Sequence, residues 1–257
     1  MSIPLIDIHQ HLNFLDSPND LLIEHQNKMG VDLTILLPSS EDFSFDKGLL
    51  AKVPDTQRAY EFCQENENYL FAANFSPNNL NLIEKYINKG ARMIGEIKYD
   101  TSSDSDTIWE YCEIAQQFNV PILIHFENNK GISNLNNFEK TLKRFPDVNF
   151  IGHAVLWWAE VDDKTDYLMD KYDNLYADIS ANSGLRALKK PSSESFVVNY
   201  QDRILFGSNC PPNHPYGGSS SHCIGVESKK RLEQICDKSI LEKIYYRNAK
   251  NLLKIDL

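Results

Sequence analysis

Residues 5–13 read LIDIHQHLN, a short apolar run that ends in a histidine, a spacer and a second histidine. Further runs of this kind recur along the whole chain, each rich in aliphatic or aromatic residues and each of strand length. Together they predict eight strands, at residues 4–8, 31–37, 70–74, 93–97, 121–126, 149–152, 175–179 and 203–207.

Amphipathic segments separate these predicted strands. Residues 17–30, SPNDLLIEHQNKMG, carry Ser17 or Asn19 as a candidate cap and end at Gly30, as expected for a helix. Strands that alternate with helices predict parallel strands buried on both faces. Eight such units most simply close into a single-domain (β/α)8 TIM barrel of the α/β class, although a doubly wound open sheet fits the same pattern.

Length and composition agree with one soluble domain. A barrel of this type needs about 250 residues, and the chain has 257 without a linker or low-complexity tract, so we expect one domain over residues 1–257. The first residues do not resemble a secretory signal, and no apolar run approaches the roughly 20 residues of a membrane span. We therefore expect a cytoplasmic protein that is not a membrane protein.

The net charge bears on nucleic acid binding, and the cysteine spacing bears on disulfides and zinc sites. The formal net charge of −10 disfavours attraction to nucleic acid phosphates, so we expect no nucleic acid partner. The five cysteines show no C-x-x-C pair and suggest neither a disulfide framework nor a zinc ribbon. The five are Cys63, Cys112, Cys210, Cys223 and Cys236, and we expect most of them to be reduced and buried.

Four histidines, His9, His11, His125 and His153, lie where apolar runs end. In a barrel the carboxyl ends of the strands meet at one mouth, so these four imidazoles should converge there. A lone histidine at such a place is usually a core residue bonded to a carbonyl. Four together predict a divalent metal, zinc by donor type, with iron, manganese and cobalt left open. Such a metal lowers the pKa of a bound water towards 7 and so provides a nucleophile.

The motifs DIHQH at 7–11, ILIHF at 122–126, FIGHA at 150–154 and ILFGSN at 204–209 resemble those of the amidohydrolase superfamily. The likeness is strongest to its amidohydrolase-related branch, which includes aminocarboxymuconate semialdehyde decarboxylase and lactonases. The resemblance implies that His9, His11 and His125 bind the metal. It also implies that His153 orients the water or polarises the substrate.

Asn209 departs from the family pattern. The family normally has an aspartate at this strand-eight position, which binds the metal and takes the proton from the attacking water. An amide coordinates weakly through its oxygen but cannot accept that proton. Three readings stay open: an engineered change, a natural residue in an enzyme that uses another base, or a loss of catalysis. We expect a metal in all three.

Strand four, MIGEIKYD at 93–100, holds a second ambiguity. Glu96 resembles the glutamate of TatD-like phosphoesterases, which bridges a second ion. The alternative is an interior pair of Glu96 with Lys98, or a lysine that contacts only the substrate. We expect one metal ion rather than two.

Three further residues are candidates for substrate binding. Trp157 either forms an apolar wall of the pocket or packs between outer helices. Arg186 either pairs with a substrate carboxylate or is a solvated helix charge. His214 lies in a long loop after strand eight, which is either a lid over the mouth or a plain connection.

The leading functional hypothesis is a metal-dependent hydrolase that acts through a metal-activated water on a small carbonyl compound, an amide, a lactone or an ester. The alternatives are non-oxidative decarboxylation of an unsaturated or aromatic acid, TatD-like phosphoester cleavage, and a non-catalytic metalloprotein that binds a small ligand. The sequence does not identify the substrate. Barrels of this kind often pair, so a homodimer is one option for the oligomeric state.

Overall fold

The computed structural model describes residues 3–40, 53–99, 101–126, 135–210 and 222–256, with the side chains of 135–136 and 155–163 left out. Eight strands follow one another in chain order, each close to its predicted position: β1 (Ile6–Gln10), β2 (Leu33–Leu36), β3 (Tyr69–Phe71), β4 (Ile94–Ile97), β5 (Ile122–Ile124), β6 (Phe150–Gly152), β7 (Leu175–Ile179) and β8 (Ile204–Phe206). Neighbouring strands within the β1–β2–β3 and β4–β8 ladders pair in parallel. The predicted TIM barrel is confirmed.

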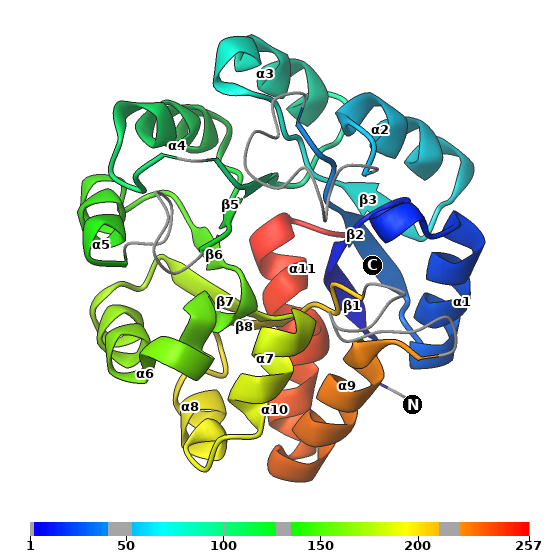
Figure 1. Ribbon diagram of the computed structural model, residues 1–257, viewed down its shortest axis with the longest axis vertical. Coiled ribbons are helices and arrows are strands. Elements are labelled where there is room, and N and C mark those ends of the chain that lie inside the picture. The colour runs from blue at the N-terminus through cyan, green and yellow to red at the C-terminus, as the bar shows by residue number, and fades with distance from the viewer. Residues whose placement is uncertain (1–2, 41–52, 100, 127–134, 211–221, 257) are drawn as a thin grey trace.

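Helices surround the strands on the outside (Figure 1). The α-helices of the described residues are α1 (Asn19–Met29), α2 (Thr56–Glu65), α3 (Asn81–Ile87), α4 (Asp106–Phe118), α5 (Leu135–Arg144), α6 (Ala154–Lys171), α7 (Ala181–Leu188), α8 (Ser193–Asn199), α9 (Ile224–Ile235), α10 (Lys238–Glu242) and α11 (Asn248–Leu253). Gly30 ends α1 with a φ of 70°, as predicted, but neither Ser17 nor Asn19 caps its start, because the residue before the helix is Pro18. Among the helices of the described residues, none is both long and apolar enough to cross a bilayer.

The barrel closes through hydrogen bonds at two seams. A bridge between Ala73 and Ile94 joins the β1–β2–β3 ladder to the β4–β8 ladder. At the other seam, the Asn209 backbone N–H donates to the His9 carbonyl at 2.8 Å, and the Ser208 N–H donates to the Asp7 carboxylate at 2.9 Å. The second seam therefore fixes the end of β8 beside the carboxyl end of β1, where His9 and His11 lie.

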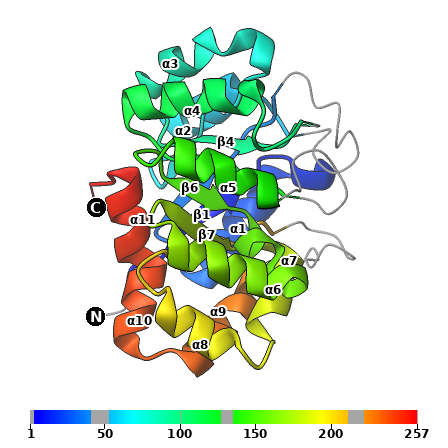
Figure 2. The ribbon, with the colours of Figure 1, turned by 90° about the vertical axis from the view of Figure 1, so that its left-hand side faces the viewer.

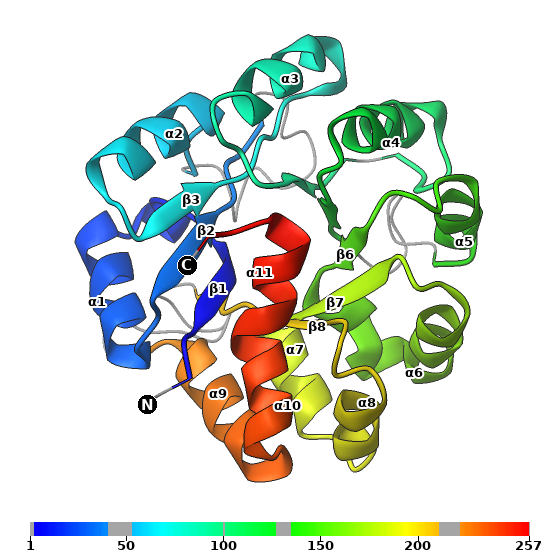
Figure 3. The same cartoon turned by 180° about the vertical axis from the view of Figure 1, so that it is seen from behind.

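Two apolar layers hold this arrangement. The inner layer fills the barrel with aliphatic side chains such as Ile8, Ile35 and Leu205, and it includes Leu252 of α11. The outer layer packs the strands against the surrounding helices. Figures 2 and 3 show α11 lying across one end of the barrel, the end where the inner layer meets it. The opposite end, where the strands finish, is left for polar residues.

One disulfide departs from the sequence expectation. Cys210, just after β8, is bonded to Cys223, just before α9, with their Cα atoms 5.4 Å apart. Sequence spacing gives no sign of this pairing, because it is the barrel that brings the two segments together. Of the other three cysteines, Cys112 is buried, whereas Cys63 and Cys236 are half-buried.

Gly95 of β4 allows the close strand packing that places Glu96. Its φ is 130°, and a Cβ there would collide with the Leu123 carbonyl oxygen of β5. We expect Gly95→Ala to lower the free energy of unfolding by about 2–4 kcal/mol, since it adds both an unfavourable φ and a backbone clash. Urea unfolding measures this change. Gly30→Ala is the control, because its φ is also positive but no atom lies within 4 Å of the new Cβ. Equal losses in the two variants would contradict the packing argument.

Candidate metal centre

The four strand-end histidines meet at one place, as their positions in the sequence predict. The ring centroids lie 5.3 Å apart for His9 and His11, 4.6 Å for His9 and His153, and 4.8 Å for His125 and His153. All four residues are buried. His9 lies in β1, and His11, His125 and His153 lie just after β1, β5 and β6, so three separate strands build the cluster. Their role as metal ligands stays a prediction.

His9 and His11 are each fixed by one ring nitrogen. His9 Nδ1 donates to Asp178 Oδ2 at 2.7 Å, and His11 Nδ1 donates to the Leu37 carbonyl at 2.7 Å. A carboxylate and a carbonyl only accept hydrogen bonds, so the Nδ1 atoms carry the hydrogens. The two Nε2 atoms are buried and have no hydrogen-bond partner among the described residues. This is the arrangement of metal-binding histidines, which usually donate their other ring nitrogen to an oxygen.

Glu96 faces the two Nε2 atoms. Its Oε2 lies 3.7 Å from His9 Nε2 and 3.7 Å from His11 Nε2, and its Oε1 accepts a hydrogen bond from His125 Nδ1 at 2.5 Å. Two donors on one tetrahedral zinc ion are about 3.4 Å apart, given bonds of about 2.1 Å. The separations observed here are therefore close to those that a shared cation requires. Glu96 thus lies in the cluster, and its role as a metal ligand stays a prediction.

Asn209 also fits a cation. Its side-chain oxygen Oδ1 is buried without a hydrogen-bond partner among the residues described, and its backbone is bonded to that of His9. Ligand atoms of His9, Glu96 and His153 lie within 4.8 Å of one another. An oxygen and nitrogen donor set of this kind suits zinc and other divalent transition metals. The residues present therefore fit the predicted metal.

Asp178 and Ser180 complete the centre, and the sequence analysis missed both. Asp178 lies in β7, and besides His9 it accepts the Ala154 N–H at 2.6 Å and the Ser180 hydroxyl at 2.7 Å. His153 Nδ1 lies 3.1 Å from Ser180 Oγ. Because that hydroxyl gives its hydrogen to Asp178, His153 Nδ1 is the donor of this bond. Asp178 thus orients two imidazoles, one directly and one through Ser180.

The carboxylates set the charge of the imidazoles. Burial alone would lower the pKa of His9, but the negative charges of Asp178 and Glu96, with the hydrogen bond to Asp178, outweigh it and raise this pKa to about 9. Burial and the charge of His9 lower the pKa of His11 to about 3. Burial opposes the ionised form of Asp178, yet the facing His9 and His153 hold the pKa of this carboxyl below its usual value. In the metal-free protein at pH 7, His9 is therefore charged and His11 is neutral.

This charge state predicts that metal binding releases a proton. Coordination through Nε2 needs a neutral His9, so binding removes the proton that this ring holds up to a pH of about 9. We expect zinc affinity to rise about tenfold per pH unit between about pH 6 and pH 8 and to level off above about pH 9. Calorimetry in buffers of different ionisation heat counts the proton. A His222→Gln variant, altered at an exposed histidine bonded to Glu227, should behave like the parent. Affinity that does not change with pH in this range would contradict this charge assignment.

Of the remaining predicted residues, Lys98 and Arg186 have described side chains. Lys98 is buried just after β4, close in sequence to Glu96. Arg186 is exposed on α7, where its guanidinium donates to Ser183 Oγ at 3.4 Å, so the structure does not bring it to the histidines. The side chain of Trp157 on α6 and the whole of His214 lie outside the described residues.

The family model amidohydrolase 2, described as amidohydrolase, matches residues 91–255 of the chain. This stretch covers more than half of the chain and includes His125, His153 and Asn209. The chain belongs to the amidohydrolase 2 family. The resemblance inferred from the strand-end motifs is confirmed. A comparison with curated proteins found no match.

Solved structures share the amidohydrolase fold over nearly the whole chain. An uncharacterized TIM-barrel protein from Bordetella bronchiseptica is 14% identical, with a TM-score of 0.73 and 98% of each chain covered. 2,6-Dihydroxybenzoate decarboxylase from Rhizobium is 12% identical, with a TM-score of 0.66 and coverage of 98% of this chain and 99% of that one. A probable 2-pyrone-4,6-dicarboxylic acid hydrolase from Acinetobacter baumannii is 12% identical, with a TM-score of 0.68 and the same coverage. At these identities the likeness establishes the fold alone.

Proposed function

We propose that this amidohydrolase-family protein is a metal-dependent hydrolase that adds water to a small carbonyl compound such as a lactone, an ester or an amide. One observation carries the proposal: the buried Nε2 atoms of His9 and His11 face Glu96 without hydrogen-bond partners among the described residues. Family membership and the fold shared with a probable hydrolase support it. A divalent cation held by His9, His11, Glu96 and Asn209 would polarise the carbonyl oxygen and acidify a coordinated water.

His153 is the residue that we assign as proton acceptor. Its Nδ1 hydrogen is committed to Ser180, so Nε2 is left as the basic atom of the neutral ring. Burial lowers the pKa of His153, and the charge of His9 adds to this effect, against the opposing negative charge of Asp178. The ring is therefore neutral at pH 7, the form that a general base requires. In this proposal His153 takes the proton from the attacking water and later gives it to the leaving group.

Asn209 then has a role that does not involve proton transfer. Its backbone N–H is used in the barrel seam with His9, so its side chain is held at the edge of the cluster. The side-chain oxygen is a neutral cation ligand and the side-chain N–H₂ group is a donor for a substrate oxygen. Of the three readings of this position, the proposal favours a natural asparagine in an enzyme that uses another base.

Changing Asn209 to aspartate tests this assignment. If His153 is the base, Asn209→Asp should change kcat/KM by less than about tenfold, because the proton acceptor is untouched. The measurement is the initial rate of the zinc-loaded parent and variant on the same substrate. An inactive parent together with an active variant would show that the missing carboxylate is the base, and the role given to His153 would be wrong.

The reaction class is tested with two substrate panels. Metal-free protein, zinc-loaded protein and zinc-loaded protein with excess chelator are each given lactones, esters and amides, and separately aromatic and unsaturated acids. We expect hydrolysis only in the zinc-loaded sample, with one oxygen atom of ¹⁸O-labelled water in the product acid. Release of carbon dioxide from the acids, with no hydrolysis of the first panel, would contradict the proposal and identify a decarboxylase.

A further inference from the structure

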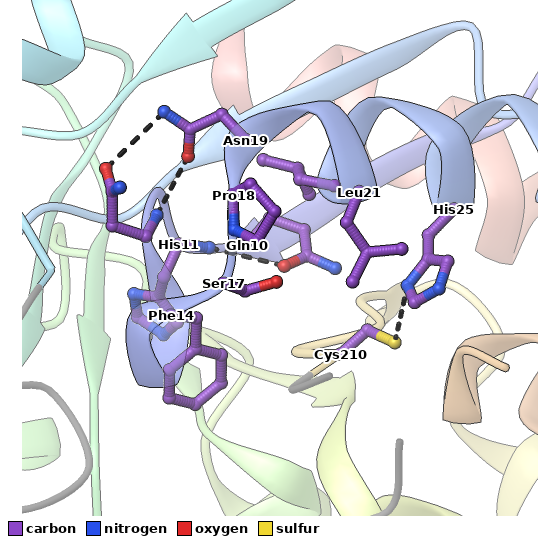
Figure 4. Close-up of a pocket in the computed structure, with 11 residues that line it drawn as sticks. Gln10, His11, Phe14, Ser17, Pro18, Asn19, Leu21, His25 and Cys210 are labelled. Atoms are coloured by element: carbon purple, nitrogen blue, oxygen red, sulfur yellow. Dashed lines mark hydrogen bonds between the residues drawn. The ribbon is translucent and has the colours of Figure 1, made fainter. Parts of the chain in front are cut away.

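A second group of metal-binding side chains lies outside the histidine cluster. It consists of Cys210 after β8, Cys223 before α9 and His25 of α1. All three are buried, and their ligand atoms lie within 4.8 Å of one another. His25 Nδ1 is 3.6 Å from Cys210 Sγ, and Figure 4 shows the two side chains pointing toward each other. The proposed hydrolysis uses none of these three residues.

The chemistry of this group differs from that of the barrel mouth. Two sulfur atoms and one imidazole nitrogen form a soft donor set, which selects zinc and similar cations rather than magnesium or calcium. A site with three such ligands keeps a fourth position for water. A small pocket borders His25 and Cys210 on one side and His11 on the other, and it has room for about one water molecule. The structure thus brings three candidate ligands together, and two of them, His25 and Cys210, border this pocket.

The oxidation state of the two cysteines decides whether they can bind. In the structure they form a disulfide, and it is the thiolate that ligates metals. Reduction breaks the S–S bond and adds two electrons and two protons, supplied by two molecules of a small thiol that leave joined as their own disulfide. Two thiolates on one zinc ion are about 3.8 Å apart. The Cα atoms, 5.4 Å apart, leave the side chains within reach of that separation.

We propose that reduced Cys210 and Cys223, together with His25, form a second metal site for a soft divalent cation such as Zn²⁺, and that the disulfide is the closed form of the same site. The proposal does not depend on the hydrolase function. The two metal centres are neighbours along the chain, because Cys210 directly follows Asn209, whose backbone N–H donates a hydrogen bond to the His9 carbonyl.

Cobalt is the probe that separates the two sites, since only thiolate ligands give Co²⁺ strong charge-transfer absorption in the near ultraviolet. Metal-free protein is reduced with a phosphine and titrated with Co²⁺ without air. We expect the thiolate band to saturate by about two equivalents of added Co²⁺ per chain, because the barrel mouth binds up to one of them, and to be absent from protein that keeps its disulfide. This pair of samples needs no substitution, so it is valid even if a variant fails to fold.

Variants then assign the ligands. Cys210→Ser and Cys223→Ser should each abolish the band, whereas Cys63→Ser, altered at a half-buried cysteine elsewhere, should keep it. A His9→Ala, His11→Ala double variant should also keep it, so loss of the barrel-mouth metal is distinguishable from loss of this site. No thiolate band in the reduced protein, an unchanged band in Cys223→Ser, or a disulfide that thiol counting shows to resist reduction in the folded protein would each overturn the proposal.

Discussion

Replacing His153 by glutamine is expected to lower kcat/KM for hydrolysis by about 10²–10⁴, because glutamine keeps a polar side chain of similar reach but cannot accept a proton. The hydrogen bond from the Ser180 hydroxyl to the Asp178 carboxylate does not involve the imidazole, so it should persist in the variant. Zinc content should also persist, since the proposed ligands are His9, His11, Glu96 and Asn209. Steady-state kinetics and metal analysis of the same sample test both statements.

The pH profile adds a readout that a structural role would not change. The parent should lose activity as the pH falls through the pKa of His153, which burial places below the usual 6.5, whereas the glutamine variant should lack this limb. His222→Gln is the matched control, because that histidine is exposed and bonded to Glu227. A variant with full activity would exclude His153 as the base. A variant that loses its zinc would instead make His153 a ligand, as the 4.8 Å grouping with His9 and Glu96 permits.

Replacing Asp178 by asparagine is expected to weaken zinc binding by about 10–100-fold. The carboxylate accepts the Nδ1 hydrogen of His9, which leaves Nε2 for the metal. An asparagine whose amide N–H₂ faces the ring would favour the other tautomer, with the hydrogen on Nε2 and the ligand position blocked. The variant also loses the negative charge that faces His9. Competition with a chromophoric chelator measures the affinity.

Asp178→Asn should also be distinguishable from simple misfolding. Its Oδ1 position can still accept the Ala154 N–H, so a circular dichroism spectrum like that of the parent is expected. Asp202→Asn provides the control, since that side chain is exposed and forms an ion pair with Lys243 away from the histidine cluster. Equal zinc affinity in parent and Asp178→Asn would show that His9 does not bind a metal through Nε2.

Most of the fold could be predicted because short sequence patterns indicate its strands and helices. Parallel strands buried on both faces appear as short apolar runs, and the histidines are visible because each stands where such a run ends. His9, His125 and His153 could therefore be placed together from the sequence, although 144 residues separate the first from the last (153 − 9 = 144). Barrel closure does the rest, since it brings all strand ends to one mouth.

Asp178 was missed because its partners are distant in sequence. His9 lies 169 residues away and Ala154 lies 24 residues away. A signal was nevertheless present: β7 reads LYADI, and a charge inside a strand buried on both faces requires a partner. The Cys210–Cys223 bond had no such signal, because scattered cysteines show no pairing until the ends of β8 and α9 are placed in space.

Anomalous diffraction from crystals of the reduced, zinc-loaded protein, recorded at the zinc absorption edge, tests the central claim most directly. The account predicts a zinc peak about 2.0–2.1 Å from the Nε2 atoms of His9 and His11, with an oxygen of Glu96 or Asn209 in the same coordination sphere. A barrel mouth without a zinc peak, or a zinc ion bound there by other residues while both Nε2 atoms stay uncoordinated, would contradict it.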